Sequence, residues 1–282
     1  MSQTRVIFCS DVHLCHQQWC GWTSEQRMDR MIGQLNAHYE ERPYEKLVFL
    51  GDYSLDHWEW DIKGSWIEHG VSESQRFVRD YASRLKAPYY MLPGNHEQYG
   101  EALWQQLVGM PRKDYFVVGG YLIICCDNFA GLLDPVEHSD GVYSPTDLDF
   151  VRQAMAQYPD LPVILCAHYF DIEDEEPEAF YTFLKEEKRI TLLVCGHDHI
   201  VEITDLGEQA GHVCLYHDGQ FSYAGGRQSP VDNMWGFCEA VLTDKGVEMV
   251  YIEPENDIKV GGKPYHHDYT EKCRKFFPRR DL

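Results

Sequence analysis

Short apolar runs recur along the first two thirds of the chain, and each is followed directly by polar residues. The runs are five or six residues long and rich in aliphatic and aromatic side chains. Runs of this length and composition are typical of buried β-strands. The five clearest strands are predicted at Arg5–Ser10, Lys46–Leu50, Pro88–Leu92, Pro162–Ala167 and Ile190–Cys195.

Apolar positions at helical spacing separate these strands. Met28, Met31 and Leu35 recur every three or four residues, which predicts a helix over Ser24–Glu41 with Ser24 as its N-cap. Alternating strands and helices indicate an α/β fold. Further helices are predicted at Ser72–Leu85, near Tyr99–Leu107, at Pro145–Gln157 behind a Ser144 cap, and near Pro177–Glu187.

Strands dominate the later part of the chain. Gly119-Gly120 predicts a two-residue hairpin turn between strands at 115–118 and 121–126. Four more strands are predicted at 200–204, 213–217, 236–242 and 247–252. A chain of 282 residues is long enough for one large domain. We expect a single domain over residues 1–258, followed by a polar C-terminal tail over 259–282.

The charge of the chain restricts its partners. Twenty-five basic and 46 acidic side chains give a formal net charge of -21. Nucleic acid and anionic membranes are bound through Lys and Arg, so neither is an expected partner of such a surface. A small phosphoester can still be captured where bound cations reverse the charge locally. The sequence does not specify the oligomeric state.

Cysteine usage indicates a reducing compartment. Cys9, Cys125, Cys126, Cys166 and Cys195 lie in apolar strand runs, where cysteine usually acts as a small buried hydrophobe. The chain has no C-x-x-C pair and no run of about 20 apolar residues, and because residues 1–4 lead straight into a predicted strand, no signal region is expected. The expected location is the cytoplasm.

Metal-ligating side chains follow each of the five predicted strands. Open α/β sheets usually bind ligands at the carboxyl ends of their strands. A mixture of Asp, Asn and His at five such ends predicts a two-metal site for phosphoester chemistry. The polar segments are Asp11-Val12-His13, Gly51-Asp52, Gly94-Asn95-His96-Glu97, His168 and Gly196-His197-Asp198-His199.

This series resembles the motifs of the calcineurin-like metallophosphoesterase superfamily: D-x-H, G-D, G-N-H-[DE], H and G-H-x-H. All five motifs are present in order, and the resemblance spans roughly residues 5 to 205. It implies the superfamily's fold, a four-layer α/β/β/α sandwich of two mixed sheets flanked by helices. It also implies hydrolysis of a phosphoester by a hydroxide held between two metal ions.

The resemblance assigns a role to eight of the motif residues. It implies that Asp11, His13 and His199 hold one metal, and that Asp52 bridges both. The second metal would be held by Asn95, His168 and His197. Imidazole and carboxylate together suit Mn, Fe, Zn, Co or Ni better than Mg or Ca. His96 would be the catalytic residue that gives a proton or a hydrogen bond to the leaving oxygen. Asp198 is interpreted as a supporting or surface residue.

Substrate contacts are expected in three segments outside the motifs. The segment 53–71 is long for a strand-to-helix connection and carries Trp58 and Trp60. These rings could form an apolar wall for the substrate or pack the loop onto the body. His16, three residues after the D-x-H motif, and Arg227 are the other candidate contacts.

Three functions fit these features. The favoured one is hydrolysis of a small-molecule phosphomonoester or phosphodiester, including a nucleotide or cyclic nucleotide. The second is a protein phosphatase or nuclease of the same superfamily. The protein-phosphatase branch carries an Arg before G-N-H-E, whereas Pro93 stands there in this chain, and the negative charge disfavours a nuclease. The third is a non-catalytic scaffold that retains the fold.

Overall fold

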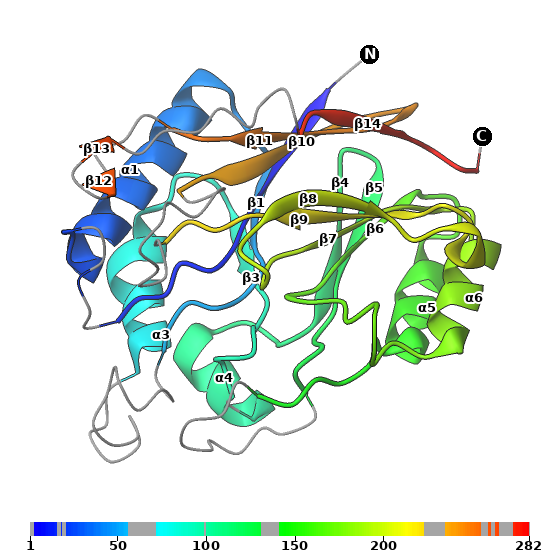
Figure 1. The fold of residues 1–282 in the computed structure, drawn as a ribbon, viewed down its shortest axis with the longest axis horizontal. Helices are drawn as coiled ribbons and strands as arrows, with labels where there is room; N and C mark the ends of the chain where they lie inside the picture. Colours follow the sequence, from blue (N-terminus) through cyan, green and yellow to red (C-terminus); the bar gives the residue numbers. More distant parts are fainter. Residues whose placement is uncertain are drawn as a thin grey trace.

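Two six-stranded sheets face each other in the structure, and helices cover both outer faces (Figure 1). The structure is a computed structural model. It describes residues 3–15, 18, 21–55, 72–98, 100–130, 141–222, 235–254, 259–260, 263–264 and 273–281. The predicted four-layer α/β/β/α sandwich is confirmed.

The first sheet has the strand order β14-β11-β10-β1-β2-β3. Its parallel half delivers the first three motifs, because β1, β2 and β3 all end at the same edge of the sheet. The antiparallel half closes the other side of β1. The bounds are β1 Thr4–Cys9, β2 Lys46–Phe49, β3 Tyr89–Met91, β10 Phe237–Thr243, β11 Gly246–Ile252 and β14 Lys275–Pro278.

The second sheet has the order β4-β5-β6-β7-β9-β8. Strands β5, β6, β7 and β9 run parallel, and β4 and β8 are antiparallel edges. The bounds are β4 Asp114–Val118, β5 Tyr121–Cys125, β6 Val163–Cys166, β7 Ile190–Cys195, β8 Val201–Asp205 and β9 Cys214–Asp218. A separate pair, β12 Lys259–Val260 and β13 Lys263–Pro264, forms a two-stranded ribbon.

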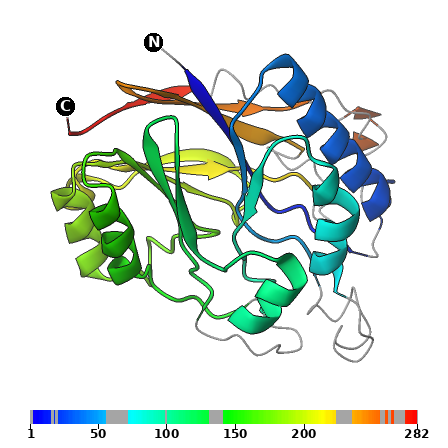
Figure 2. The ribbon, with the colours of Figure 1, turned by 180° about the vertical axis from the view of Figure 1, so that it is seen from behind.

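The helices lie at opposite ends of the molecule. Seen from behind, α1 lies on one side of the strands, and α5 and α6 lie on the other (Figure 2). Successive side chains of β1 and β2 point to opposite faces of the sheet: Ile7 and Phe49 pack under α1, whereas Phe8 and Val48 face the second sheet. The helices are α1 Ser24–Glu41, α3 Glu73–Arg76, α4 Glu101–Val108, α5 Leu148–Gln157 and α6 Glu178–Glu186, with short turns η1 Phe77–Tyr81, η2 Ala82–Arg84 and η3 Glu208–Ala210.

Two predicted helix caps are wrong. Thr23, not Ser24, caps α1 through a capping box with Gln26, and the Ser24 hydroxyl instead accepts from the Arg27 guanidinium at 2.7 Å. Asp147 caps α5, which begins at Leu148 rather than Pro145.

The reason for the later start of α5 is a long-range contact. The Glu176 carboxylate accepts from the Thr146 amide at 3.1 Å and from the Thr146 hydroxyl at 2.5 Å. These bonds hold the residues before Asp147 outside the helix.

Two further elements differ from the predictions. The helix expected over Ser72–Leu85 is divided into an α-helical turn, a π-helical turn (η1) and a 3-10 turn (η2). The interpretation of 259–282 as a polar tail missed β14, which pairs with β11 and buries Phe277 between the sheets. No helix within the described ranges is long and apolar enough to cross a membrane.

Candidate metal centre

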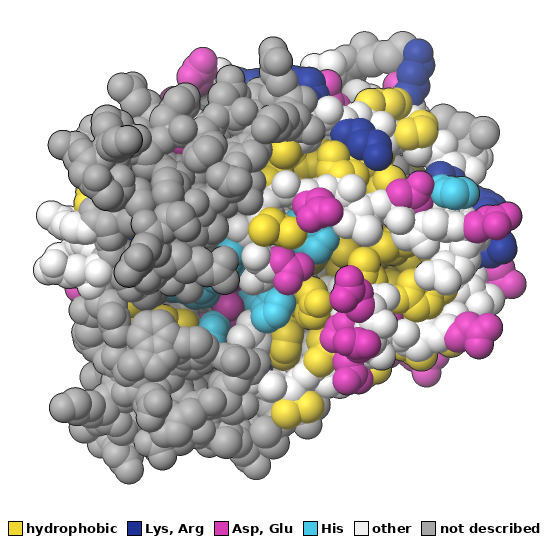
Figure 3. Space-filling model, viewed as in Figure 1, with side chains coloured by type: hydrophobic (Ala, Val, Ile, Leu, Met, Phe, Trp, Pro, Cys, Tyr) yellow, Lys and Arg dark blue, Asp and Glu magenta, His cyan; other side chains and the backbone are white. Residues whose placement is uncertain are grey.

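Seven predicted ligands meet where the parallel strands of both sheets end. β1, β2 and β3 lead to the first three motifs, and β6 and β7 lead to the last two. Several histidine side chains are visible together near the middle of one face, with acidic side chains beside them (Figure 3). The residues brought together are Asp11, His13, Asp52, Asn95, His168, His197 and His199.

The backbone turns sharply at these strand ends. Asp11, His13 and Asp52 adopt the left-handed region, with φ of 54°, 45° and 59°. Each such non-glycine residue costs roughly 1–2 kcal/mol, so the surroundings must hold it. The His13 amide donates to the Asp52 carbonyl at 3.1 Å, and the Asp11 amide donates to the Gly51 carbonyl at 3.1 Å. These bonds join the ends of β1 and β2 and turn the side chains towards one centre.

The ligand atoms form three overlapping groups. One group is Asp11, His13 and His199, and another is Asp52, His168 and His197; within each group the atoms lie within 4.8 Å of one another. The third is His13, Asp52 and His96.

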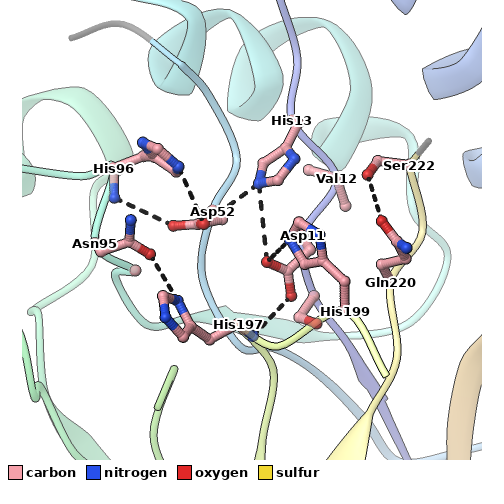
Figure 4. A network of polar contacts seen from close by, with 12 residues as sticks. Asp11, Val12, His13, Asp52, Asn95, His96, His197, His199, Gln220 and Ser222 are labelled. Carbon is pink, nitrogen blue, oxygen red and sulfur yellow. Dashed lines mark hydrogen bonds and ion pairs between the residues drawn. The ribbon is translucent and has the colours of Figure 1, made fainter. Parts of the chain in front are cut away.

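Asp52 occupies the middle of the centre (Figure 4). Its Oδ2 lies 3.3 Å from His13 Nε2, 3.4 Å from His168 Nε2 and 3.6 Å from His96 Nε2. This is the place that a bridging carboxylate requires, although the ligand roles themselves stay a prediction.

Three donor atoms converge on one point that a cation could occupy. His168 Nε2 and His197 Nδ1 lie 3.2 Å apart, and both lie within 3.0 Å of Asn95 Oδ1. Two imidazole nitrogens and an amide oxygen that converge on one point can all be satisfied by a metal ion. The backbone allows this close packing only because Gly94 has no side chain: a Cβ there would collide with the Asp52 carboxylate.

The centre is strongly polarised. Burial opposes ionisation of Asp11, but the nearby His199 imidazole outweighs it and lowers the pKa of Asp11 to about 2. Burial also opposes the charge on His168, yet Asp52 raises the pKa of His168 to about 10. Burial, opposed by the Asp52 charge, lowers the pKa of His96 to about 3. The lowered pKa of Asp11 and the raised pKa of His168 have one cause, which is that the buried carboxylates favour a positive charge beside them, as a cation site requires.

Glu97 supports the centre through the backbone and belongs to none of the three groups of candidate ligands among the described residues. This fully buried carboxylate accepts from the amides of Gly94 at 2.8 Å, Asp52 at 2.9 Å, Tyr53 at 2.9 Å and Ser54 at 3.2 Å. It thereby ties the turn after β2 to the turn after β3. Glu97 is the last residue of the G-N-H-[DE] motif, and the sequence pattern alone assigns no role to it.

Two other supports were missed. Arg112 is buried, pairs with Asp127 at 2.6 Å and donates to the Glu97 carbonyl at 2.9 Å, so it clamps the turn that carries His96. No local pattern distinguishes this arginine from a surface residue. Phe129 and Tyr169 form an aromatic side to the centre: the Tyr169 ring lies 4.5 Å from the His197 ring, and the Phe129 ring lies 5.7 Å from the His168 ring. The position of Tyr169 next to His168 in the sequence was the available signal.

The predicted substrate contacts His16, Trp58, Trp60 and Arg227 lie outside the described residues. Trp22, which lies between the D-x-H motif and α1, packs edge-on against the buried Trp235, with ring centroids 5.9 Å apart. Trp22 therefore joins the hydrophobic core beneath α1.

Sequence comparison finds relatives with phosphoesterase names. The calcineurin-like phosphoesterase family matches residues 4–201. A curated protein of Arcobacter nitrofigilis, named probable glycerophosphodiester phosphodiesterase GpdQ, is 24% identical over 157 residues. The match covers 50% of this chain and 56% of that protein, so it spans little more than half of the relative.

Solved structures share the fold at low identity. Purple acid phosphatase PPD1 from yellow lupin (Lupinus luteus) seeds has a TM-score of 0.56 and 11% identity, covering 92% of this chain and 52% of that chain. GAP50, described as the anchor in the inner membrane complex of Plasmodium, has a TM-score of 0.57 and 12% identity, covering 99% and 90%. At these identities the likeness concerns the fold alone.

Proposed function

We propose, from the premise that this chain belongs to the calcineurin-like phosphoesterase family, that it is a dinuclear metal-dependent hydrolase of a small-molecule phosphomonoester or phosphodiester. The observation that carries the proposal is the position of Asp52, whose Oδ2 lies 3.4 Å from His168 Nε2 in its own group of candidate ligands and 3.3 Å from His13 Nε2 in the other group. A carboxylate with two oxygens and a negative charge suits a place between two cations.

Seven residues of the chain would hold the two ions, and an eighth would assist the leaving group. Asp11, His13 and His199 would hold one ion, Asn95, His168 and His197 the other, and Asp52 both. When bound, two cations lower the pKa of water towards about 7 and offset the charge of a phosphoryl group. His96, whose Nε2 faces Asp52 Oδ2 at 3.6 Å, would donate a proton or a hydrogen bond to the leaving oxygen.

The substrate class follows from charge and size. A chain of net charge -21 disfavours a long polyanion, whereas a small phosphoester meets only the local field of the centre. The name of the curated relative is consistent with a diester substrate. A nucleotide or cyclic nucleotide remains within the proposed class. The metal identity, among Mn, Fe, Zn, Co and Ni, and the cytoplasmic location stay predictions.

The test is hydrolysis of p-nitrophenyl phosphate beside bis-p-nitrophenyl phosphate, with Mn, Ni, Co, Zn and Mg added separately. We expect metal-dependent turnover that Asp52→Asn lowers by at least about 100-fold, because the amide loses the charge that holds both ions. The ratio of the two rates reports monoester against diester preference. Bound metal without turnover of either ester would favour the non-catalytic scaffold.

A further inference from the structure

The segment that carries His197 and His199 crosses over the end of another strand. In the second sheet β9 lies between β7 and β8, so residues 196–200, which join β7 to β8, must pass over the carboxyl end of β9. His217, next to the last residue of β9, is paired with Cys195 at the end of β7. It therefore lies beneath the crossing segment.

Asp198, at the middle of this segment, contacts His217. Its Oδ2 lies 3.1 Å from His217 Nδ1, and His217 is only 6% exposed. An ionised carboxylate only accepts hydrogen bonds, so Nδ1 of His217 is the donor. Among the described residues, Asp198 belongs to none of the three groups of candidate ligands. The Asp198 carboxylate therefore contacts His217 of β9 and not the candidate metal centre.

The residues on either side of Asp198 are conformationally strained. His197 and His199 have φ of 68° and 56°, in the left-handed region that non-glycine residues avoid. Such conformations persist only where neighbouring contacts over-determine them. The His197 amide donates to Asp11 Oδ2 at 3.0 Å, but Asp11 is itself a candidate ligand. The contact between Asp198 and His217 fixes the segment independently of the ligands.

The contact between Asp198 and His217 would affect the ligands of both metal ions. His197 Nδ1 points to Asn95 Oδ1 at 3.0 Å, in the group assigned to the second ion, whereas His199 Nε2 points to Asp11 Oδ1 at 3.0 Å, in the group assigned to the first (Figure 4). The two ligands flank Asp198 in the sequence. A shift at Asp198 would therefore move a ligand of each ion.

We propose that Asp198 and His217 form a positioning pair that keeps His197 and His199 preorganised for two metal ions. The pair acts through the ligands and touches neither substrate nor metal. This inference rests on the proposed metal centre, and it assigns a function to Asp198, which occupies the variable position of the G-H-x-H motif. Partners of this kind around a metal site typically alter metal affinity or activity by about 10–100-fold.

The test compares Asp198→Ala, Asp198→Asn and His217→Phe with the wild-type protein. Binding of Co²⁺ is measured by calorimetry, and the visible absorption of the Co²⁺-loaded protein reports ligand geometry. We expect Asp198→Ala and His217→Phe to weaken Co²⁺ binding by about 10–100-fold and to change the absorption bands. Asp198→Asn keeps an oxygen that accepts from His217, so its loss should be only a few-fold. At saturating Co²⁺ the alanine variant should also lose kcat, with KM little changed.

The chain offers a matched control. Asp205 and His212 form an Asp–His pair with the same 3.1 Å separation, but both are exposed and neither flanks a candidate ligand. Asp205→Ala should leave Co²⁺ affinity and absorption unchanged. Asp198→Ala with the affinity and spectrum of the wild-type protein would overturn the proposal. If Asp198→Ala fails to fold, His217→Phe carries the same expectation and the same refutation.

The two proposals fail in different ways. Wild-type protein that binds Co²⁺ but hydrolyses neither ester would refute the phosphoesterase and leave the positioning pair to be decided by the binding data. Wild-type protein that binds no Co²⁺ would overturn both.

Discussion

Replacing Glu97 by Gln should destabilise the metal-free protein by about 2–6 kcal/mol. Each carboxylate oxygen accepts two buried amides: Oε1 those of Tyr53 and Ser54, and Oε2 those of Asp52 and Gly94. A glutamine amide keeps one oxygen and turns the other position into a donor, so two buried N–H groups lose their acceptor. Each such loss costs about 1–3 kcal/mol. Since domains are stable by only about 5–15 kcal/mol, the effect is large.

Urea unfolding followed by circular dichroism measures this loss directly. Glu176→Gln is the matched control, because Glu176 is also a buried carboxylate with several donors. Its close contacts, from the Tyr143 hydroxyl at 2.6 Å and the Thr146 hydroxyl at 2.5 Å, both fall on Oε1. A glutamine oxygen can replace Oε1, so this variant should lose no more than about 1 kcal/mol. A loss below about 1 kcal/mol in Glu97→Gln, or one no larger than in the control, would refute the reasoning.

Two other predictions follow from single contacts. Gly94→Ala should weaken Co²⁺ binding by at least about 10-fold, since a Cβ there would collide with the Asp52 carboxylate. The control is Gly33→Ala, on an open side of α1, which should bind Co²⁺ normally and gain up to about 1 kcal/mol of stability. Equal Co²⁺ affinities of the two variants, measured by calorimetry, would contradict this prediction. Burial raises the pKa of Tyr121 to about 12 from the ordinary value of 10.0. The folded protein therefore keeps a proton that the unfolded chain loses, and this stability is full below about pH 10 and declines as the pH rises from about 10 to about 12. Urea unfolding at several pH values should show a shallower decline in Tyr121→Phe, and parallel profiles would refute the assignment.

The parts of the fold that sequence predicted are those with local causes. The sequence predicts strands at Lys46–Leu50 and Ile190–Cys195, observed as β2 and β7, because a buried strand is a continuous apolar run that is visible without knowing its partners. The polar residues beyond them were identified as one site because parallel strands deliver their carboxyl ends to one edge. The resemblance to a family then gave each residue a role that spacing alone does not give.

The parts that were missed depend on distant partners. The helix expected at Ser72–Leu85 is interrupted at Phe77, whose ring packs on Phe49 and Tyr53, and those contacts cannot be seen in the local pattern. Strand β14 is only four residues long and becomes a strand by pairing with β11.

Arg112 was missed for a similar reason. It supports the metal centre because Asp127 and the Glu97 carbonyl come to it through the fold. Periodicity identifies the side of an element that is buried, but not the group that it will meet there.

The candidate ligands come from both sheets, and this division links metal binding to the integrity of the sandwich. β1, β2 and β3 belong to one sheet and β6 and β7 to the other, so an ion held by Asp52, His168 and His197 would join the two layers at their shared edge. A ligand that binds only the folded state stabilises it by about 2.7 kcal/mol at one hundred times its dissociation constant. Depletion of metal in the cell would then expose the protein to unfolding and proteolysis, and its abundance would follow the supply of the ion.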